Sequence, residues 1–292
     1  MQPRRPQPGS QKRPLYRDPR YTQRQPLGME PISPRSARFK RMTRKEFLAT
    51  LAALVVGALL FAFFWHHHDA GRPAAHPAGQ QATAQQFNKK QYSQSDPASL
   101  WVVVNKHRPL SPLDYAPADL VNPNMPLRLN KADGEMQVRA PAAAGLEELN
   151  AAASQQGLHL MLASGYRSYP LQVSVYNSEV RANGQAGADQ ESARPGYSEH
   201  QTGLAADLEP LSRKCEVQTC FADTPEGIWL AANAWKYGFT LRYQQNAKPI
   251  TGYEYEPWHV RFIGKPLAAE LHRTAVPTLE QFFGLPDAPN YQ

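Results

Sequence analysis

Apolar and polar positions alternate in short runs from Ser99 to the end of the chain, a pattern typical of strands and helices around one core. Uninterrupted apolar runs predict buried strands at 100–105, 158–164, 203–209, 239–243 and 258–264. Longer stretches of helix-forming residues, most of them followed by a glycine, predict helices at 142–156, 169–182, 224–237 and near 266–273. This mixed order predicts a single α+β domain at 99–292, with a central antiparallel sheet flanked by helices.

A different pattern lies nearer the N-terminus, where 47–65 form an uncharged apolar run of 19 residues. As a helix, this run would be roughly 28 Å long, about the thickness of one hydrocarbon core. A cleaved signal peptide is the alternative, but the run begins far from the N-terminus and ends in bulky FAFFW instead of small residues. We therefore expect one transmembrane helix that anchors the chain in a membrane.

Both flanks of this run are polar and lack apolar periodicity. Residues 1–46 are rich in Arg, Pro and Gln, a composition that predicts a disordered tail. Residues 66–98 are rich in Ala, Gln, Pro and Gly, and they predict a flexible linker. The linker begins with three histidines, which we interpret as polar padding because consecutive histidines on a flexible strand form no defined metal site.

Positive charge is concentrated in the tail. Residues 1–46 contain 13 Lys and Arg against three acidic residues, whereas the whole chain has a net charge of +7. The rest of the chain is therefore slightly acidic, and the pI of about 9.4 reflects the tail. This uneven distribution argues against nucleic acid as a partner. A basic segment before the apolar run indicates a cytoplasmic N-terminus and an extracytoplasmic domain at the cytoplasmic membrane.

The two cysteines of the chain, Cys215 and Cys220, lie five positions apart in CEVQTC. In a cytosolic protein, such a pair would suggest metal binding or redox chemistry. In a domain exported across the membrane, a small loop-closing disulfide is favoured.

Residues able to bind metal interrupt the apolar strands in three segments, 164–172, 195–209 and 255–262. His200, Asp207 and His259 could supply two imidazoles and one carboxylate, a set that suits a catalytic zinc site. An unpaired carboxylate would be costly in the apolar stretch LAADL, so Asp207 implies a cation or a network of donors. The alternatives are an Asp207 held by backbone amides and a His259 buried in the core; the three residues together favour the metal site.

Glu256 is the candidate general base. It lies three positions before His259, and Pro257 between them excludes helical geometry for Glu256. In a straight strand, the odd spacing would send the two side chains to opposite faces. A bend at the proline would bring both to one site, where a carboxylate outside the metal's ligand set could take a proton from water.

Arg167 follows a predicted buried strand in the segment SGYRS. A guanidinium there could meet a substrate carboxylate or the oxyanion of a tetrahedral intermediate. The alternative is a surface arginine in a turn.

Taken together, the segments SGYRS, SEHQTGLAADL, GF-x-LRY and YEPWHVRF resemble those of the D-alanyl-D-alanine carboxypeptidase family. These VanY-type zinc peptidases are grouped with lysostaphin-type and hedgehog-type domains. The resemblance covers about 99–285, and the combined pattern S-x-H-x6-D and E-x-x-H is far more specific than either half. The insert between Cys215 and Cys220 is not part of the shared pattern.

The resemblance implies a Zn²⁺ enzyme that acts on peptidoglycan stem peptides. The site it implies consists of the zinc ligands His200, Asp207 and His259, the catalytic residues Glu256 and Arg167, and Ser198 as a hydroxyl near the substrate. Gln172 and Tyr197 lie close to these residues in the sequence, so we add them as candidate substrate-binding residues.

Three functions are compatible with this site. The first is a DD-carboxypeptidase that removes D-alanine from pentapeptides, and the second is an LD-carboxypeptidase that acts on tetrapeptides. The third is a non-catalytic cell-wall-binding module, against which the retained base Glu256 argues. We expect the domain to be monomeric.

Overall fold

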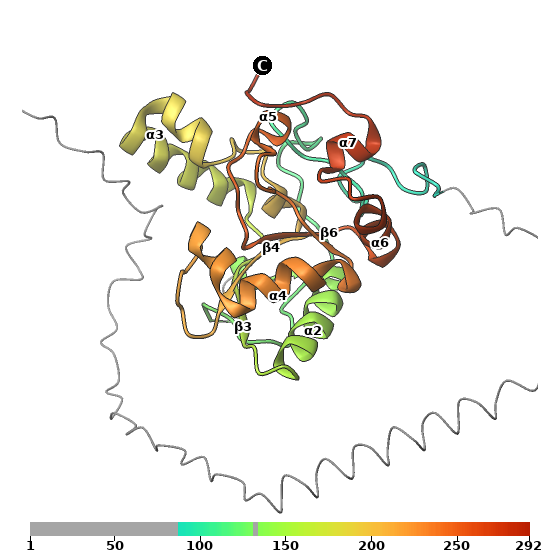
Figure 1. The fold of residues 1–292 in the computed structure, drawn as a ribbon. Coiled ribbons are helices and arrows are strands. Elements are labelled where there is room, and N and C mark those ends of the chain that lie inside the picture. Colours follow the sequence, from blue (N-terminus) through green and yellow to red (C-terminus); the bar gives the residue numbers. More distant parts are fainter. Residues whose placement is uncertain (1–86, 131–133) are drawn as a thin grey trace, which may run out of the picture. The chain divides into compact units, whose positions relative to one another are not determined.

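The computed structural model describes residues 87–130 and 134–292 (Figure 1). Our predictions for the tail at 1–46, the transmembrane helix at 47–65 and the linker up to residue 86 lie outside the described residues. Within the described part of the chain, none of the helices combines the length and the apolar character needed to cross a membrane.

The described residues form short strands and helices in mixed order, which confirms the α+β class. The strands are β1 (Leu120–Val121), β2 (Val138–Arg139), β3 (Leu160–Ser164), β4 (Ala205–Pro210), β5 (Phe239–Leu241) and β6 (His259–Phe262). The α-helices are α2 (Ala140–Ser154), α3 (Tyr169–Glu191), α4 (Pro225–Asn233), α5 (Lys248–Thr251), α6 (Lys265–Thr274) and α7 (Leu279–Phe283). The 3₁₀ helices are η2 (Gly134–Met136), η3 (Glu199–Thr202), η4 (Thr219–Asp223) and η5 (Ala234–Tyr237).

A four-stranded sheet with the order β3-β4-β6-β5 forms the centre of the domain, and all its neighbouring strands are antiparallel. The short strands β1 and β2 form a separate antiparallel pair. In Figure 1, α2 and α4 lie below β4 and β6, whereas α3, α5 and α7 lie above them. The predicted antiparallel sheet flanked by helices is therefore confirmed.

The central strands divide their side chains between the two faces of the sheet. In β4, Ala206 and Leu208 enter the main apolar core, and Asp207 between them must point to the opposite face. In β6, Val260 enters the same core, so His259 lies on the face of Asp207. One face of the sheet thus carries apolar residues, and the opposite face carries the candidate metal ligands Asp207 and His259.

Helix α2 covers the apolar face. Its core-facing stripe has at most 1% exposure and consists of Ala142, Leu146, Leu149 and Ala153. These positions recur at helical spacing, which is the signal that predicted a helix at 142–156. The structure places the helix two residues earlier, because Pro141 is suited to its first turn.

Two predicted helices are divided in the structure. Gly184, predicted as a stop, has non-helical angles (φ 70°, ψ 169°), but a second helical segment follows it and α3 ends at Glu191. The helix predicted at 224–237 becomes α4 followed by the 3₁₀ helix η5.

The strand predicted at 100–105 was wrong, although its residues are buried. Val102 and Val104 pack in the main core, whereas Trp101 joins a second apolar cluster around Ile263 and α6. The backbone carbonyls of Leu100 and Val102 accept hydrogen bonds from the guanidinium of Arg261 at 3.2 and 2.8 Å. A side chain therefore satisfies these carbonyls, and no neighbouring strand is needed to do so.

The domain begins before the predicted boundary at Ser99. The ring of Phe87 stacks on Trp101 at 5.6 Å and meets Phe282 edge-on at 5.8 Å. Our assignment of 87–98 to the flexible linker was therefore wrong, because Phe87 and Tyr92 of this segment pack against Trp101 of the second apolar cluster.

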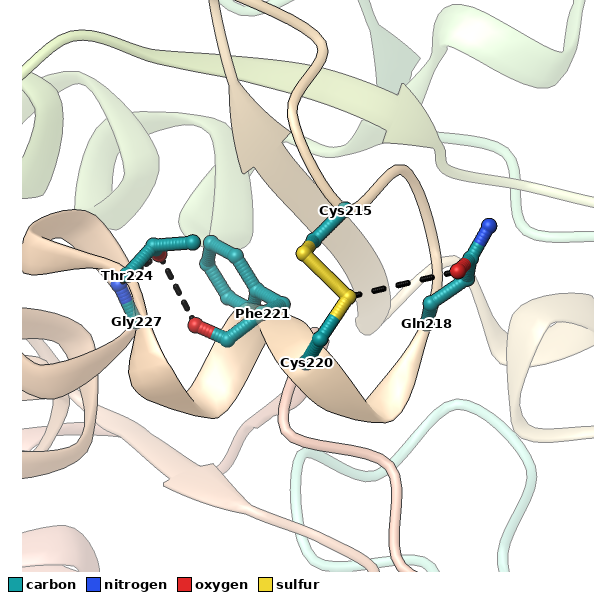
Figure 2. Close-up of a disulfide and its surroundings, with 6 residues drawn as sticks. All are labelled: Cys215, Gln218, Cys220, Phe221, Thr224 and Gly227. Atoms are coloured by element: carbon teal, nitrogen blue, oxygen red, sulfur yellow. Dashed lines mark hydrogen bonds between the residues drawn. A yellow bond between two sulfur atoms is a disulfide. The ribbon is translucent and has the colours of Figure 1, made fainter.

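Cys215 and Cys220 form the disulfide favoured by the sequence, with their Cα atoms 5.6 Å apart (Figure 2). The next residue, Phe221, is fully buried. Its carbonyl oxygen accepts a hydrogen bond from the Thr224 hydroxyl at 2.8 Å, and that hydroxyl caps α4 by accepting from the backbone N–H of Gly227. A Cβ atom on Gly227 would lie 1.9 Å from the Phe221 oxygen, so the turn requires glycine there.

Candidate active site

Two of the predicted metal ligands face each other across neighbouring strands. Asp207 in β4 and His259 in β6 are direct cross-strand partners, 52 positions apart in the sequence. The distance from Asp207 Oδ1 to His259 Nδ1 is 3.1 Å. The antiparallel register therefore brings the carboxylate and the imidazole together.

His200 reaches the same place from the 3₁₀ helix η3. This helix ends at Gly203, whose left-handed conformation (φ 65°) turns the chain into β4. His200 Nδ1 lies 2.7 Å from the carbonyl oxygen of Gly165, which can only accept a hydrogen bond, so Nδ1 carries the proton. The free Nε2 lies 3.3 Å from Asp207 Oδ2.

These three side chains fit a divalent metal ion. One ligand atom from each of His200, Asp207 and His259 lies within 4.8 Å of the others, and all three residues are buried. The side-chain partners of Asp207 are the two imidazoles, as a ligand of a shared ion requires. Two nitrogens and one carboxylate oxygen form a donor set that catalytic zinc sites use, with a further position left for water or substrate.

The charges at the site depend on burial and on the neighbours. Burial would raise the pKa of Asp207, but the hydrogen bond and the positive charge of His259 hold it well below its usual range. Burial lowers the pKa of His200, which favours a neutral imidazole. Burial also lowers the pKa of His259, but hydrogen bonds to Asp207 and Glu199 outweigh it and raise the pKa to about 10. His259 is thus an imidazolium in the metal-free protein, and metal binding would displace its Nδ1 proton.

Glu256 lies beside these residues, as the sequence predicted. Its carbonyl accepts from the backbone N–H of His259 at 3.2 Å, so Glu256 to His259 form a turn at the start of β6. This turn places Glu256 Oε2 3.7 Å from His259 Nδ1. Desolvation raises the pKa of Glu256 to about 7, although a quarter of its side chain is exposed. A carboxyl with a pKa near neutrality is suited to general acid–base chemistry.

Arg167 approaches the site after β3. Its backbone N–H donates to the carbonyl of His200 at 3.1 Å. Its guanidinium donates to Gln172 Oε1 and to Ser164 Oγ, both at 3.3 Å. Its positive charge lowers the pKa of both His200 and Glu256. Arg167 is therefore held next to the candidate metal site and is not a surface arginine in a turn.

The three candidate substrate-binding residues differ in their surroundings. Gln172 is fully buried, and its amide nitrogen donates to Ser192 Oγ and to the carbonyl of Ala193. Ser198 is 4% exposed and precedes η3, and the Tyr197 ring meets the Tyr291 ring edge-on at 5.3 Å. A direct contact of these side chains with substrate remains a prediction.

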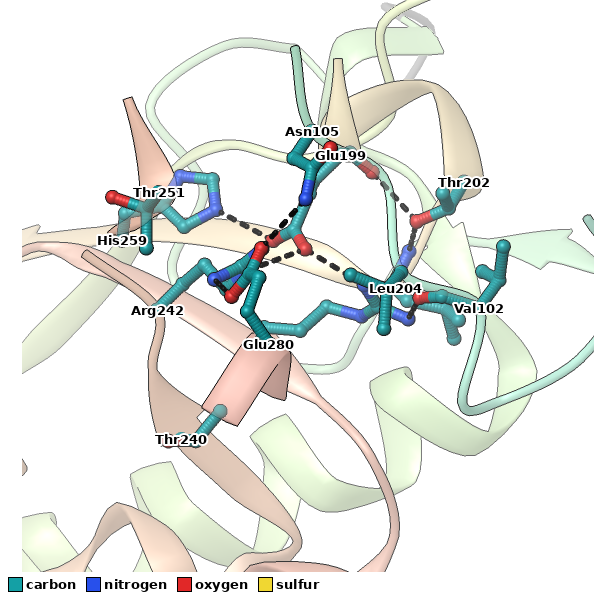
Figure 3. Close-up of polar contacts among 12 residues, drawn as sticks. Val102, Asn105, Glu199, Thr202, Leu204, Thr240, Arg242, Thr251, His259 and Glu280 are labelled. Carbon is teal, nitrogen blue, oxygen red and sulfur yellow. Dashed lines mark hydrogen bonds and ion pairs between the residues drawn. The ribbon is translucent and has the colours of Figure 1, made fainter. Parts of the chain in front are cut away.

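Sequence reasoning missed a group of buried charged residues behind His259 (Figure 3). Four side chains with 0% exposure, linked by ion pairs, form this group, and they are Glu199, Arg242, Arg261 and Glu280. Glu199 Oε2 lies 3.4 Å from His259 Nε2. The sequence did contain a signal for this group, because Arg242 and Arg261 are charged residues within predicted buried strands. The same signal identified Asp207.

Known proteins are similar to this chain in sequence and in fold. The family model described as D-alanyl-D-alanine carboxypeptidase, VanY, matches residues 135–265. A putative carboxypeptidase of Bacillus subtilis, YodJ, is 40% identical over 188 residues, which are 64% of this chain and 68% of that protein. A D-alanyl-D-alanine carboxypeptidase of Enterococcus faecium is 43% identical over 112 residues, 38% of this chain and 32% of that protein.

Solved structures agree with these matches. The LD-carboxypeptidase LdcB superposes with a TM-score of 0.62 at 40% identity, covering 64% of this chain and 87% of that one. A variant of the vancomycin-resistance D,D-pentapeptidase VanY, in complex with Zn(II), superposes with a TM-score of 0.50 at 27% identity. The match covers 62% of this chain and 97% of that one. From these matches and the convergent His, Asp and Glu side chains, we conclude that the chain belongs to the VanY-type D-alanyl-D-alanine carboxypeptidase family.

Proposed function

We propose that this protein is a zinc-dependent carboxypeptidase that removes the C-terminal D-alanine from peptidoglycan stem peptides. The observation that carries the proposal is the convergence of His200, Asp207 and His259 on one face of the sheet, with Glu256 beside them. A non-catalytic binding module would not need a carboxyl held beside the metal ligands, outside the ligand set, where Glu256 lies.

The side chains of the site have separate roles in this proposal. When bound, Zn²⁺ would supply a Lewis acid for the scissile carbonyl. Glu256 takes a proton from the attacking water and passes it to the nitrogen of the departing D-alanine. Arg167 places a positive charge beside the reacting group, where it can pair with the substrate carboxylate or with the developing oxyanion.

Two substrates are compatible with this chemistry, and the sequence alone favoured a DD-carboxypeptidase acting on pentapeptides. The structural likeness gives weight to the second candidate, an LD-carboxypeptidase acting on tetrapeptides. The LD-carboxypeptidase LdcB has a TM-score of 0.62 and 40% identity, compared with 0.50 and 27% for the D,D-pentapeptidase. Incubation of the full-length protein with defined tetrapeptides and pentapeptides, followed by mass spectrometry, will show which stem is shortened.

The central test is the Glu256→Gln variant. It should retain zinc, because Glu256 is not one of the three ligands, and turnover should fall by about 10²–10⁴-fold because the base is lost. Glu254→Gln is the matched control, since Glu254 is exposed and pairs with Lys248. Hydrolysis by Glu256→Gln at the normal rate would refute the assigned role. Zinc binding by the wild-type protein without hydrolysis of either stem would instead support a binding module.

We also propose that the domain lies outside the cytoplasmic membrane, anchored by the apolar run at 47–65. The basic surplus before this run supports a cytoplasmic N-terminus. Protease added to intact protoplasts should digest the domain, and full protection of the domain would exclude this orientation.

A further inference from the structure

The buried ion pairs behind His259 form a balanced group. Glu199 and Glu280 supply two negative charges, and Arg242 and Arg261 supply two positive charges, all with side chains at 0% exposure. Burying four charges carries a large desolvation penalty, and well-packed apolar residues often serve stability as well or better. The position of the group next to a metal ligand therefore points to a role beyond stability.

The two oxygens of Glu199 have different partners. Oε1 accepts hydrogen bonds from Arg242 Nε and from Arg261 Nη1, both at 2.8 Å. Oε2 faces His259 Nε2 at 3.4 Å. The arginines thus fix the carboxylate while its second oxygen is directed at the imidazole (Figure 3).

The arginines are themselves held in place. Arg242 Nη1 and Nη2 donate to the two carboxylate oxygens of Glu280 at 2.9 and 2.6 Å. Asn105 Nδ2 donates to Glu280 Oε1 at 2.9 Å, and Arg261 Nη2 donates to the carbonyl of Val102 at 2.8 Å. Arg242 is therefore held by α7 and Arg261 by the segment before α2, so Arg261 still fixes Glu199 when the contact between Arg242 and Glu280 is weakened.

His259 needs one tautomer to bind a metal. Its Nδ1 faces Asp207 and Glu256, at 3.1 and 3.7 Å, so Nδ1 is the nitrogen on the metal side. A coordinating nitrogen must be free of hydrogen, so the proton of a neutral His259 must be on Nε2. That N–H points at Glu199, which as an ionised carboxylate can only accept.

We propose that Glu199 is a positioning residue of the metal centre, holding His259 in the Nε2–H tautomer so that the lone pair of Nδ1 faces the ion. Arg242 and Arg261 act on the metal through Glu199, because they fix the carboxylate that orients the imidazole. This inference rests on the proposed zinc function of His200, Asp207 and His259.

The Glu199→Gln variant gives a sharp test, because glutamine has the same shape and different donors. The two arginines require an acceptor, so the amide oxygen must occupy the position of Oε1. The amide nitrogen then faces His259 Nε2 and can only donate a hydrogen bond, so Nε2 must accept it and carries no proton. The imidazole is left with its proton on Nδ1, where it blocks the metal. Zinc affinity should fall about 10–100-fold, the usual effect of losing a partner that orients a ligand.

Glu280→Gln is the matched control. It removes the same charge from the same group, and it touches Arg242 without contacting His259. Competition with a chromophoric chelator, using the full-length proteins, should show zinc affinity within about threefold of wild type for Glu280→Gln. Thermal unfolding in chelator reports the stability loss of each variant separately. Equal loss of zinc affinity in both variants, or none in Glu199→Gln, would overturn the proposal.

A spectroscopic measurement keeps the test decisive if Glu199→Gln does not fold. In the zinc-loaded wild-type protein labelled with ¹⁵N-histidine, the proton of His259 should be on Nε2. A proton on Nδ1 of His259 would overturn the proposal. Failure of the wild-type protein to bind zinc would instead refute the proposed function, so the two failures are distinguishable.

Discussion

Gln172 connects the candidate active site to the fold, and its replacement by leucine is a demanding test of that connection. The side chain is fully buried at the start of α3. Its oxygen accepts from Arg167 at 3.3 Å, and its nitrogen donates to Ser192 Oγ at 3.1 Å and to the Ala193 carbonyl at 2.7 Å. Gln172→Leu keeps a similar volume and removes all three hydrogen bonds.

The magnitude follows from these contacts. Each of the three hydrogen bonds contributes about 1 kcal/mol to stability. We expect the free energy of unfolding to fall by about 3 kcal/mol, which is about 6–12 °C in Tm for a domain of this size. Arg167 loses one of its two side-chain partners, so kcat/KM should fall about tenfold, equivalent to about 1.4 kcal/mol.

Thermal unfolding and steady-state hydrolysis of a stem peptide, measured well below Tm, will check both numbers. Ser192→Ala is the control, because it removes one acceptor of the Gln172 amide and leaves the contact with Arg167 intact. It should lower stability by about 1 kcal/mol without changing kcat/KM. If Gln172→Leu loses stability while kcat/KM stays at the wild-type value, Gln172 does not position Arg167.

Two further predictions concern pH and the disulfide. Burial raises the pKa of Glu256 to about 7 against the opposing effect of the Arg167 charge. In NMR spectra of the metal-free protein, the signal of one side-chain carboxyl carbon should therefore titrate near pH 7. This signal should be absent from the Glu256→Gln variant, and its midpoint should be higher in Arg167→Leu. The raised pKa means that the protonated Glu256 carboxyl favours the folded state at acid pH. This contribution to the free energy of unfolding is lost as the pH rises from 4.5 to about 7. An NMR titration midpoint near 4.5 would contradict the assignment. The double variant Cys215→Ser/Cys220→Ser should lose about 2 kcal/mol, because the disulfide closes a loop with a sequence separation of only 5, and zinc affinity should be retained. An unchanged Tm in the double variant would show that the constraint adds nothing to stability.

The central elements of the site could be predicted because their signals are local. Asp207 is a carboxylate in an apolar stretch, and the two-residue period of a strand then places it away from the core. The bend at Pro257, needed to bring Glu256 to His259, also follows from a local rule. The mixed order of strands and helices was sufficient for the fold class.

The parts that could not be predicted depend on contacts between distant residues. Glu199 pairs with Arg261, 62 positions away, and no local pattern identifies that partner. The segment 100–105 has the composition of a buried strand, but Arg261 satisfies two of its carbonyls. Gln172 was assigned to the pocket by its proximity in sequence, whereas its partners at 192 and 193 are set by the return of the chain after α3.

The pairing of Asp207 with His259 links assembly of the sheet to assembly of the candidate metal site. If β6 slipped by one residue against β4, the imidazole would exchange places with Val260 and point among the apolar side chains under α2. A chain folded in that way would lack the metal ligand His259 and would bury its imidazole without a hydrogen-bond partner. The register that pairs Asp207 with His259 is therefore favoured both for stability and for metal affinity. If zinc binds at this site as proposed, metal uptake would report correct strand pairing, and refolding in the presence of zinc should enrich the aligned form.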